Sequence, residues 1–141
     1  MSERGRILLA DDEDTLLQST ADLLRREGYD VEYAPDADAA LSLLKAQEFD
    51  LLFSNIRMPG NQDLAFIRNV PSVLPGLPVM LMTAFPSLDY AIQPVEIPVA
   101  AFIVKPFDIP EFLAKVSLPS VRRAVSELIQ RIHDGYDYSI A

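Results

Sequence analysis

Short apolar runs alternate along the chain with longer segments whose apolar residues recur every three or four positions. Runs of this length, bounded by polar or turn-forming residues, are typical of strands buried on both faces of a sheet. They occupy residues 7–10, 51–54, 79–82 and 99–104. Val31 and Tyr33 alternate with polar neighbours and predict one further, short strand nearer a sheet edge.

The segments between the runs show helical spacing. They predict helices over residues 14–26, 63–70 and from 110 to 116, and another that Asp36 or Asp38 caps. The expected buried faces include Leu16, Leu17, Ala21 and Leu24 in the first helix and Ala37, Ala40, Leu41 and Leu44 in the second. Alternating strands and helices predict an α/β fold, with a parallel sheet and helices on both faces.

Prolines interrupt the pattern in three places. Pro71 begins a turn-rich link to the strand at 79–82, and Pro94 and Pro98 limit the next helix to a turn or two at 87–93. The physical reason is that an internal proline removes a helical hydrogen bond and clashes with the preceding turn. Pro119 separates residues 1–118, which we expect to form one domain, from an extension over 119–141.

The extension carries an apolar stripe at helical spacing. Its members are Val121, Val125, Leu128, Ile129 and Ile132. A large exposed apolar stripe is rare on a monomer. We therefore expect this helix to pack on its own domain or to form the contact of a homodimer.

Composition excludes several classes of function. The 141 residues include 21 acidic and 12 basic side chains, and a net charge of −9 opposes binding to nucleic acid. There is no cysteine, and His133 is the sole histidine, so a thiol nucleophile and a histidine-based metal cluster are excluded. No apolar run approaches the roughly 20 residues of a membrane span, and none resembles a secretion signal, so we expect a cytoplasmic protein.

Polar residues follow the apolar runs directly. Asp11 and Asp12 follow the first run, Asn55 follows the second, Thr83 follows the third, and Lys105 follows the last. Ligands of open α/β sheets bind at the carboxyl edge of the strands, so these five side chains are expected to converge on one pocket. Separately, each has a plainer explanation, such as a solvated acidic loop with Asp14 as a helix cap, a threonine at a strand end or an exposed lysine.

The combination of motifs over roughly residues 5 to 116 resembles the receiver domain of two-component response regulators. It comprises the acidic pair Asp11-Asp12, the turn Met58-Pro59-Gly60, the hydroxyl of Thr83 before Ala84, and Lys105-Pro106. The resemblance implies a doubly wound five-stranded sheet of order 2-1-3-4-5 and a signalling module that is not an enzyme. It also implies a histidine kinase or phosphotransfer protein as partner.

The resemblance also implies a Mg²⁺ site made of hard oxygen ligands. Asp12 would bind the ion directly, Asp11 would bind it through water, and the backbone carbonyl of Arg57 would add a third contact. Thr83 and Lys105 would hold the phosphoryl group, with the Lys105–Pro106 bond in the cis form.

Phe102 lies where the family often has a switching aromatic side chain. It is also explained as an ordinary core residue of the strand at 99–104.

Asn55 stands where the family has its phosphoaccepting aspartate. A carboxamide is neutral and a poor nucleophile, so we expect no phosphorylation and weak binding of Mg²⁺. Two origins stay open. Asn55 is either native, in a pseudoreceiver that acts as a phosphate-independent interaction module, or an engineered block in an otherwise competent receiver.

A hydrolase alternative rests on Asp12 and Asp14. Their spacing resembles the Asp-x-Asp motif of haloacid-dehalogenase-like phosphatases. Thr15-Leu16 stands where that family has Gly-Thr, and no acidic pair follows Lys105. The receiver interpretation explains more of the chain.

Overall fold

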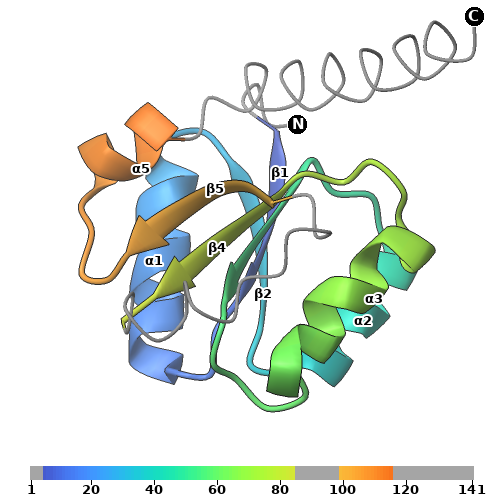
Figure 1. The fold of residues 1–141 in the computed structure, drawn as a ribbon. Coiled ribbons are helices and arrows are strands. Elements are labelled where there is room, and N and C mark those ends of the chain that lie inside the picture. The colour runs from blue at the N-terminus through green and yellow to red at the C-terminus, as the bar shows by residue number, and fades with distance from the viewer. Residues whose placement is uncertain (1–4, 85–98, 116–141) are drawn as a thin grey trace, which may run out of the picture.

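Five parallel strands form the centre of the molecule (Figure 1), which the computed structural model describes over residues 5–84 and 99–115. The strands are β1 (Arg6–Ala10), β2 (Asp30–Ala34), β3 (Leu51–Asn55), β4 (Val79–Thr83) and β5 (Val99–Val104). The helices are α1 (Asp14–Arg26), α2 (Ala37–Ala46), α3 (Ala65–Val73) and α5 (Ile109–Lys115), with a 3₁₀ turn, η1 (Gln62–Leu64), before α3.

The strand order is β2-β1-β3-β4-β5, which confirms the predicted doubly wound α/β fold. From β1 the chain moves outward to β2, then returns to the other side of β1 to form β3. The order therefore reverses between β1 and β3, and open α/β sheets bind their ligands in the crevice at such a reversal. The fold brings the ends of β1 and β3 together at this point.

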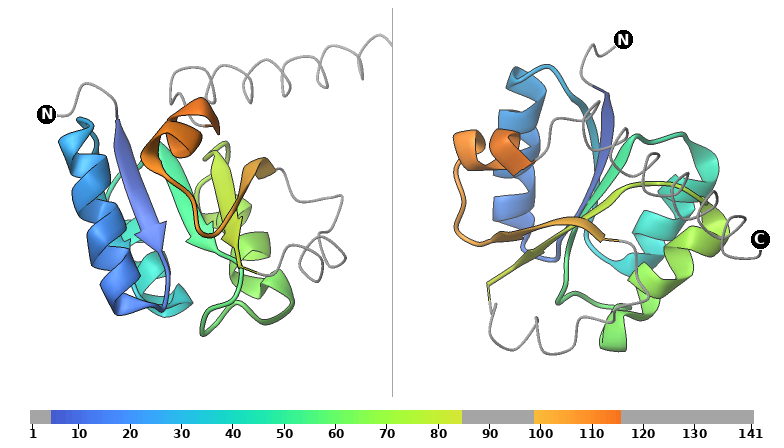
Figure 2. Two further views of the ribbon diagram at one scale, coloured as in Figure 1. Left: turned by 90° about the vertical axis from the view of Figure 1, so that its left-hand side faces the viewer. Right: turned by 45° about the horizontal axis from the view of Figure 1, so that its top comes forward.

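Among the residues that the structure describes, two helices cover each face of the sheet (Figure 2). On one face, Leu17 and Leu24 of α1 and Phe112 of α5 pack on the sheet and are almost fully buried. On the other face, Leu44 of α2 and Ile67 of α3 do the same. Both faces of the central strands are thus removed from water, which explains why β1, β3 and β4 read as continuous apolar runs.

The helical spacing predicted the span of α1 but misassigned part of its face. Leu16 was expected in the core, yet it is 38% exposed, and Thr20 takes a buried position instead. Val31 of β2 is buried as expected, whereas Tyr33 is 39% exposed. The Arg25 guanidinium, at the end of α1, lies 5.8 Å from the centroid of the Tyr33 ring, so this exposed aromatic side chain makes a cation–π contact.

The bounds of α3 differ from the prediction of residues 63–70. Leu64 adopts a left-handed φ of 61°, which separates η1 from α3 and delays the helix to Ala65. At the other end α3 continues through Pro71 to Val73. Proline is tolerated there because only the last turn loses a hydrogen bond, and the Leu74 amide closes that turn by donating to Val70 O at 2.8 Å.

Two predicted segments, the short turn at 87–93 and the apolar stripe at 121–132, lie outside the described residues. Among the helices of residues 5–84 and 99–115, none is long and apolar enough to cross a membrane.

The turn at Met58–Gly60 packs against the start of α2. The Ala37 amide donates a hydrogen bond to Pro59 O at 3.0 Å, and Gly60 has a φ of 88°. A Cβ atom added to Gly60 would lie 2.6 Å from the Cβ of Ala37. Gly60 therefore serves two needs, a left-handed backbone and a close approach of the turn to α2.

Gly60→Ala should lower the free energy of unfolding by about 1–2 kcal/mol through backbone strain and by about 1–3 kcal/mol more through the clash with Ala37. Gly76→Ala is the matched control, because Gly76 has a φ of 83° but open space around the added Cβ. Urea denaturation of both variants measures the difference. Equal losses would show that α2 yields to the extra methyl group without cost.

Candidate functional site

A small pocket of about 230 Å³ lies at the carboxyl edge of the sheet. Backbone hydrogen bonds across the strand ends set its frame. The Ile56 amide donates to Met82 O at 3.0 Å, and the Lys105 amide donates to Thr83 O at 2.8 Å. These bonds hold the ends of β3, β4 and β5 level, so that side chains separated by many residues in sequence meet above the sheet.

Asp11 is buried beside this carboxyl-edge pocket, with an exposed fraction of 1%, and it bonds to the lining residues Asn55 and Lys105. Its Oδ2 lies 2.6 Å from the Nζ of Lys105, and its Oδ1 accepts hydrogen bonds from Asn55 Nδ2 at 3.2 Å and the Glu13 amide at 3.1 Å. A buried carboxylate is tolerated only when it is paired and hydrogen-bonded. Here the chain supplies every partner from its own groups.

The Asn55 amide faces inward in a defined orientation. Its Nδ2 donates to Asp11 Oδ1 at 3.2 Å and to the backbone carbonyl of Arg57 at 2.8 Å. The Arg57 carbonyl and the Asp11 carboxylate, which pairs with Lys105, accept hydrogen bonds and cannot donate them. Only the nitrogen end of the Asn55 amide can therefore bond to both. A hydrogen-bond donor thus lies between two of the oxygens expected to hold a metal.

Lys105 reaches the pocket from the end of β5, and only 7% of its side chain is exposed. The Lys105–Pro106 peptide bond is cis, the isomer expected from the sequence. The Lys105 Nζ also lies 3.6 Å from Glu13 Oε1. Sequence reasoning did not single out Glu13, although it belongs to the acidic run after β1 and could have been found there.

The other predicted residues are less central. Asp12 and Arg57 have exposed side chains and line the pocket. Thr83 is fully buried at the end of β4, and its neighbour Ala84 lines the pocket. Phe102 is half-buried and packs against the core on the α2 and α3 face of the sheet.

Asn61 is a second residue that the sequence did not reveal. It is 4% exposed, and its Nδ2 donates to Ile56 O at 2.7 Å while its Oδ1 accepts from the Ile67 amide at 3.2 Å. These bonds tie the loop after β3 to α3. Its position directly after the Pro-Gly turn is the only sequence signal for this role.

The pocket fits a Mg²⁺ ion poorly with Asn55 in this orientation. Mg²⁺ needs oxygen ligands, but an amide N–H group occupies the space between Asp11 and the Arg57 carbonyl. Within the part of the chain that the structure describes, no three histidine, cysteine, aspartate or glutamate side chains are placed to hold a metal. An ion would have to displace both hydrogen bonds of the Asn55 amide.

Comparison with known families decides the classification. The family model of the response regulator receiver domain matches residues 7–117, which is most of the chain. The chain belongs to the response regulator receiver family. The match begins at the second residue of β1 and extends past the end of α5, so it includes every residue of the carboxyl-edge pocket.

Several regulators resemble this receiver domain over part of their length. The response regulator FleR of Pseudomonas aeruginosa is 31% identical over 131 residues, which is 93% of this chain and 27% of FleR. The DNA-binding transcriptional regulator NtrC of Proteus hauseri is 31% identical over 114 residues, 81% of this chain and 24% of NtrC. The chain therefore spans about a quarter of the length of these relatives.

Solved receiver structures share the fold. The non-phosphorylated HemR receiver domain from Leptospira biflexa superposes with a TM-score of 0.69 at 29% identity, over 83% of this chain and 93% of that one. TrrA from Thermotoga maritima, solved in complex with Mg(2+)-BeF, gives a TM-score of 0.66 at 25% identity, over 78% and 94% of the two chains.

Membership of this family has three direct consequences. The chain is a receiver module of two-component signalling, a family of regulators and not of enzymes, so the phosphatase alternative is set aside. A receiver domain implies a histidine kinase as partner. Receiver domains also bind Mg²⁺, as TrrA does in its complex.

Proposed function

We propose that this receiver domain signals without phosphorylation of residue 55, because Asn55 occupies the phosphoacceptor position. The support is its place as the last residue of β3, 6% exposed and within hydrogen-bond distance of Asp11. Phosphoryl transfer to a receiver needs an anionic oxygen as nucleophile, and the group presented by this chain is a neutral amide. The site contains Asp11 and Lys105 but lacks a carboxylate at residue 55 to act as the nucleophile.

The observation that carries the proposal is the pair of hydrogen bonds from Asn55 Nδ2 to Asp11 and to the Arg57 carbonyl. They join the end of β1 to the loop after β3, the connection that a bound cation would otherwise make. Lys105 pairs with the second oxygen of Asp11, so the charge of this buried carboxylate is balanced by a group of the chain itself. We therefore expect weak binding of Mg²⁺ and a conformation that does not depend on it.

In this proposal the domain acts in the cytoplasm as an interaction module. A histidine kinase or phosphotransfer protein contacts its carboxyl edge without transferring a phosphoryl group, and the contact itself carries the signal. The absence of phosphorylation at residue 55 follows for either origin of Asn55, whereas signalling by contact alone applies to a native Asn55. The acidic net charge of −9 supports a protein partner over nucleic acid.

Incubation with acetyl phosphate and Mg²⁺ should leave the mass of the unmodified protein unchanged. Asn55→Asp should restore the nucleophile and gain one phosphoryl group, because Asp12, Thr83 and Lys105 keep their places at the pocket. Intact-mass spectrometry of both forms measures the result, with peptide mapping to locate any adduct.

The double variant Asn55→Asp/Lys105→Met is the control, because it presents the nucleophile without the cation beside it, and it should label far more slowly. A phosphoryl adduct mapped to the pocket of the unmodified protein would overturn the proposal. An unlabelled Asn55→Asp variant would instead show that residue 55 is not the only block to phosphorylation.

A further inference from the structure

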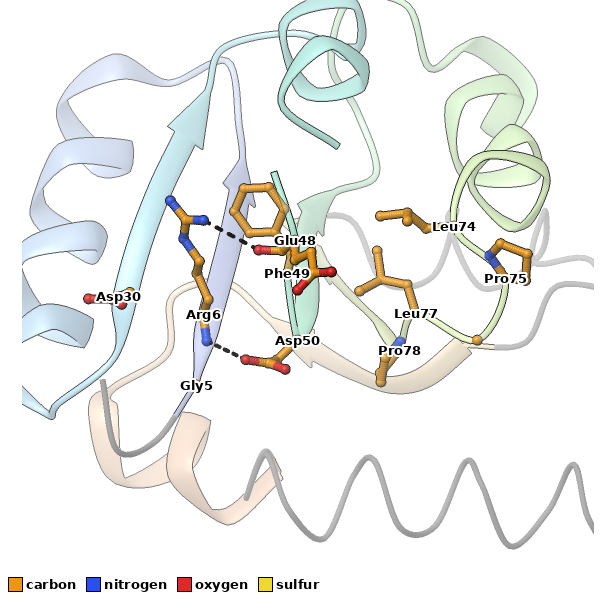
Figure 3. A pocket seen from close by; sticks show the side chains of 11 residues that line it. Gly5, Arg6, Asp30, Glu48, Phe49, Asp50, Leu74, Pro75, Leu77 and Pro78 are labelled. Carbon is orange, nitrogen blue, oxygen red and sulfur yellow. Dashed lines mark hydrogen bonds between the residues drawn. The ribbon is translucent and has the colours of Figure 1, made fainter. Parts of the chain in front are cut away.

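A larger groove opens at the opposite edge of the sheet, where the strands begin (Figure 3). It encloses about 690 Å³, and we call it the amino-edge groove. Four segments meet there: the start of β1, the start of β2, the loop before β3 and the loop before β4. The residues used below are Arg6, Asp30, Glu48, Phe49, Asp50 and Leu77. None of them belongs to the carboxyl-edge pocket.

The groove combines an apolar side with acidic groups. Figure 3 shows Phe49 between the Arg6 side chain and Leu77. The acidic groups are Asp30, Glu48 and Asp50, so with Arg6 the groove carries a formal net charge of −2.

Arg6 is already engaged by its neighbours. Its guanidinium lies 5.1 Å from the centroid of the Phe49 ring and donates to Glu48 O at 3.5 Å and to the Gln47 side chain. Its backbone amide donates to Asp50 Oδ2 at 2.8 Å. Because Arg6 binds the walls of the groove, the exposed acids Asp30 and Glu48 set the charge seen by a ligand. The groove suits an apolar segment that carries positive charge.

The chain itself contains such a segment. Residues 121–132 combine the apolar stripe of the predicted C-terminal helix with three arginines and one glutamate, a net charge of +2. Their charge is opposite to that of the groove, and their apolar side chains match its apolar wall. Helices that lay an apolar face into a groove are a common mode of recognition.

The described chain also ends close to this edge. Phe112 of α5 contacts the ring of Tyr29 with a centroid distance of 6.1 Å, and Asp30, the next residue, lines the groove. Lys115, less than one helical turn beyond Phe112, ends α5. The five residues 116–120 can span up to about 17 Å when extended, enough to cross the edge of a small sheet.

We propose that residues 121–132 of the same chain dock in the amino-edge groove, with the apolar stripe against Phe49 and Leu77 and the arginines near Asp30 and Glu48. The domain thereby covers its own apolar groove, at the edge opposite the signalling pocket. The proposal is independent of whether residue 55 can be phosphorylated.

Disulfide trapping tests this placement in the full chain, which has no cysteine of its own. Leu77→Cys is combined in turn with Val125→Cys, Leu128→Cys and Ile132→Cys, and Pro75→Cys serves as a second, exposed groove position. Under mild oxidation at least one pair should form a bond within the chain, seen as a faster monomer band on a non-reducing gel and reversed by reductant. A disulfide needs Cα atoms within about 7 Å, so a bond reports close contact.

The matched control replaces the groove cysteine by Ser19→Cys, an exposed position on α1 outside the groove. It should form no bond with the same three partners. If no groove pair reacts, the proposal is wrong. If the groove pairs give only dimers between chains, the occupant is the segment of a second copy, and the proposal for a single chain is overturned as well.

The charge argument has its own measurement. Asp30→Lys/Glu48→Lys should slow disulfide formation at low salt by about threefold or more, because the arginines lose their acidic partners. Asp22→Lys, on the exposed side of α1, should leave the rate unchanged. Equal rates in the cysteine pair alone, in Asp30→Lys/Glu48→Lys and in Asp22→Lys would show that Asp30 and Glu48 do not contribute to docking.

Discussion

Replacing Lys105 by methionine is expected to lower the free energy of unfolding by about 3–5 kcal/mol. The Lys105 Nζ lies 2.6 Å from Asp11 Oδ2, and the two side chains are 7% and 2% exposed. Methionine has a similar length but no charge, so the variant leaves Asp11 buried with only the hydrogen bonds of Asn55 and the Glu13 amide. Urea denaturation at neutral pH, followed by circular dichroism, measures the loss.

Two companion proteins separate this effect from a general cost of removing lysine. Lys45→Met, on the exposed surface of α2, should change stability by no more than about 0.5 kcal/mol. Asp11→Asn/Lys105→Met removes both charges and should lose less than the sum of the two single variants, since neither charge is left unpaired. Additive losses would show that the pair contributes nothing to stability as a pair.

Most of the fold could be predicted because each element carries a strong local signal. The apolar runs at β1, β3, β4 and β5 leave no polar face, which in an alternating chain implies a parallel sheet covered on both sides. β5 lies at the edge of the sheet and is only partly buried at Ala101, Phe102 and Val104. The sequence predicted the span of α1 better than it predicted which of its side chains are buried. Its leucines outnumber the positions that the sheet can cover, so Leu16 is exposed while the smaller Thr20 is buried. Which of them packs inward depends on the tilt of α1 against the sheet, a tertiary property.

The position of the carboxyl-edge pocket at the strand ends could be predicted, whereas the part of Glu13 and the internal bonds could not. Parallel strands bring Asp11, Asn55 and Lys105 to one edge whatever their separation in sequence. The sequence does not state which end of the Asn55 amide faces inward. That follows from the oxygens around it, one of which is the backbone carbonyl of Arg57. The amino-edge groove was missed altogether, because its walls come from four segments with no shared pattern.

Asn55→Asp is expected to destabilise the domain by about 3 kcal/mol when Mg²⁺ is removed by a chelator. The carboxylate would place an oxygen where Asn55 Nδ2 now lies, 3.2 Å from Asp11 Oδ1 and 2.8 Å from the Arg57 carbonyl. Two hydrogen bonds become two contacts between oxygen atoms, one of them between like charges in a buried site. Lys105, whose Nζ lies 2.6 Å from Asp11 Oδ2, would offset only part of this repulsion.

The same variant should recover stability when Mg²⁺ is added, by about 2.7 kcal/mol at a free concentration one hundred times its Kd, because the ion binds the folded pocket and not the unfolded chain. The unmodified protein should show almost no such gain, since its amide already joins the two oxygens. Asn55→Ala separates the two causes: it loses the hydrogen bonds without adding a charge, so it should be destabilised in chelator and show much less recovery with Mg²⁺. Thermal melts of the three proteins with and without Mg²⁺ measure these differences. If Mg²⁺ stabilised the unmodified protein as strongly as Asn55→Asp, the Asn55 amide would not be taking the place of the ion.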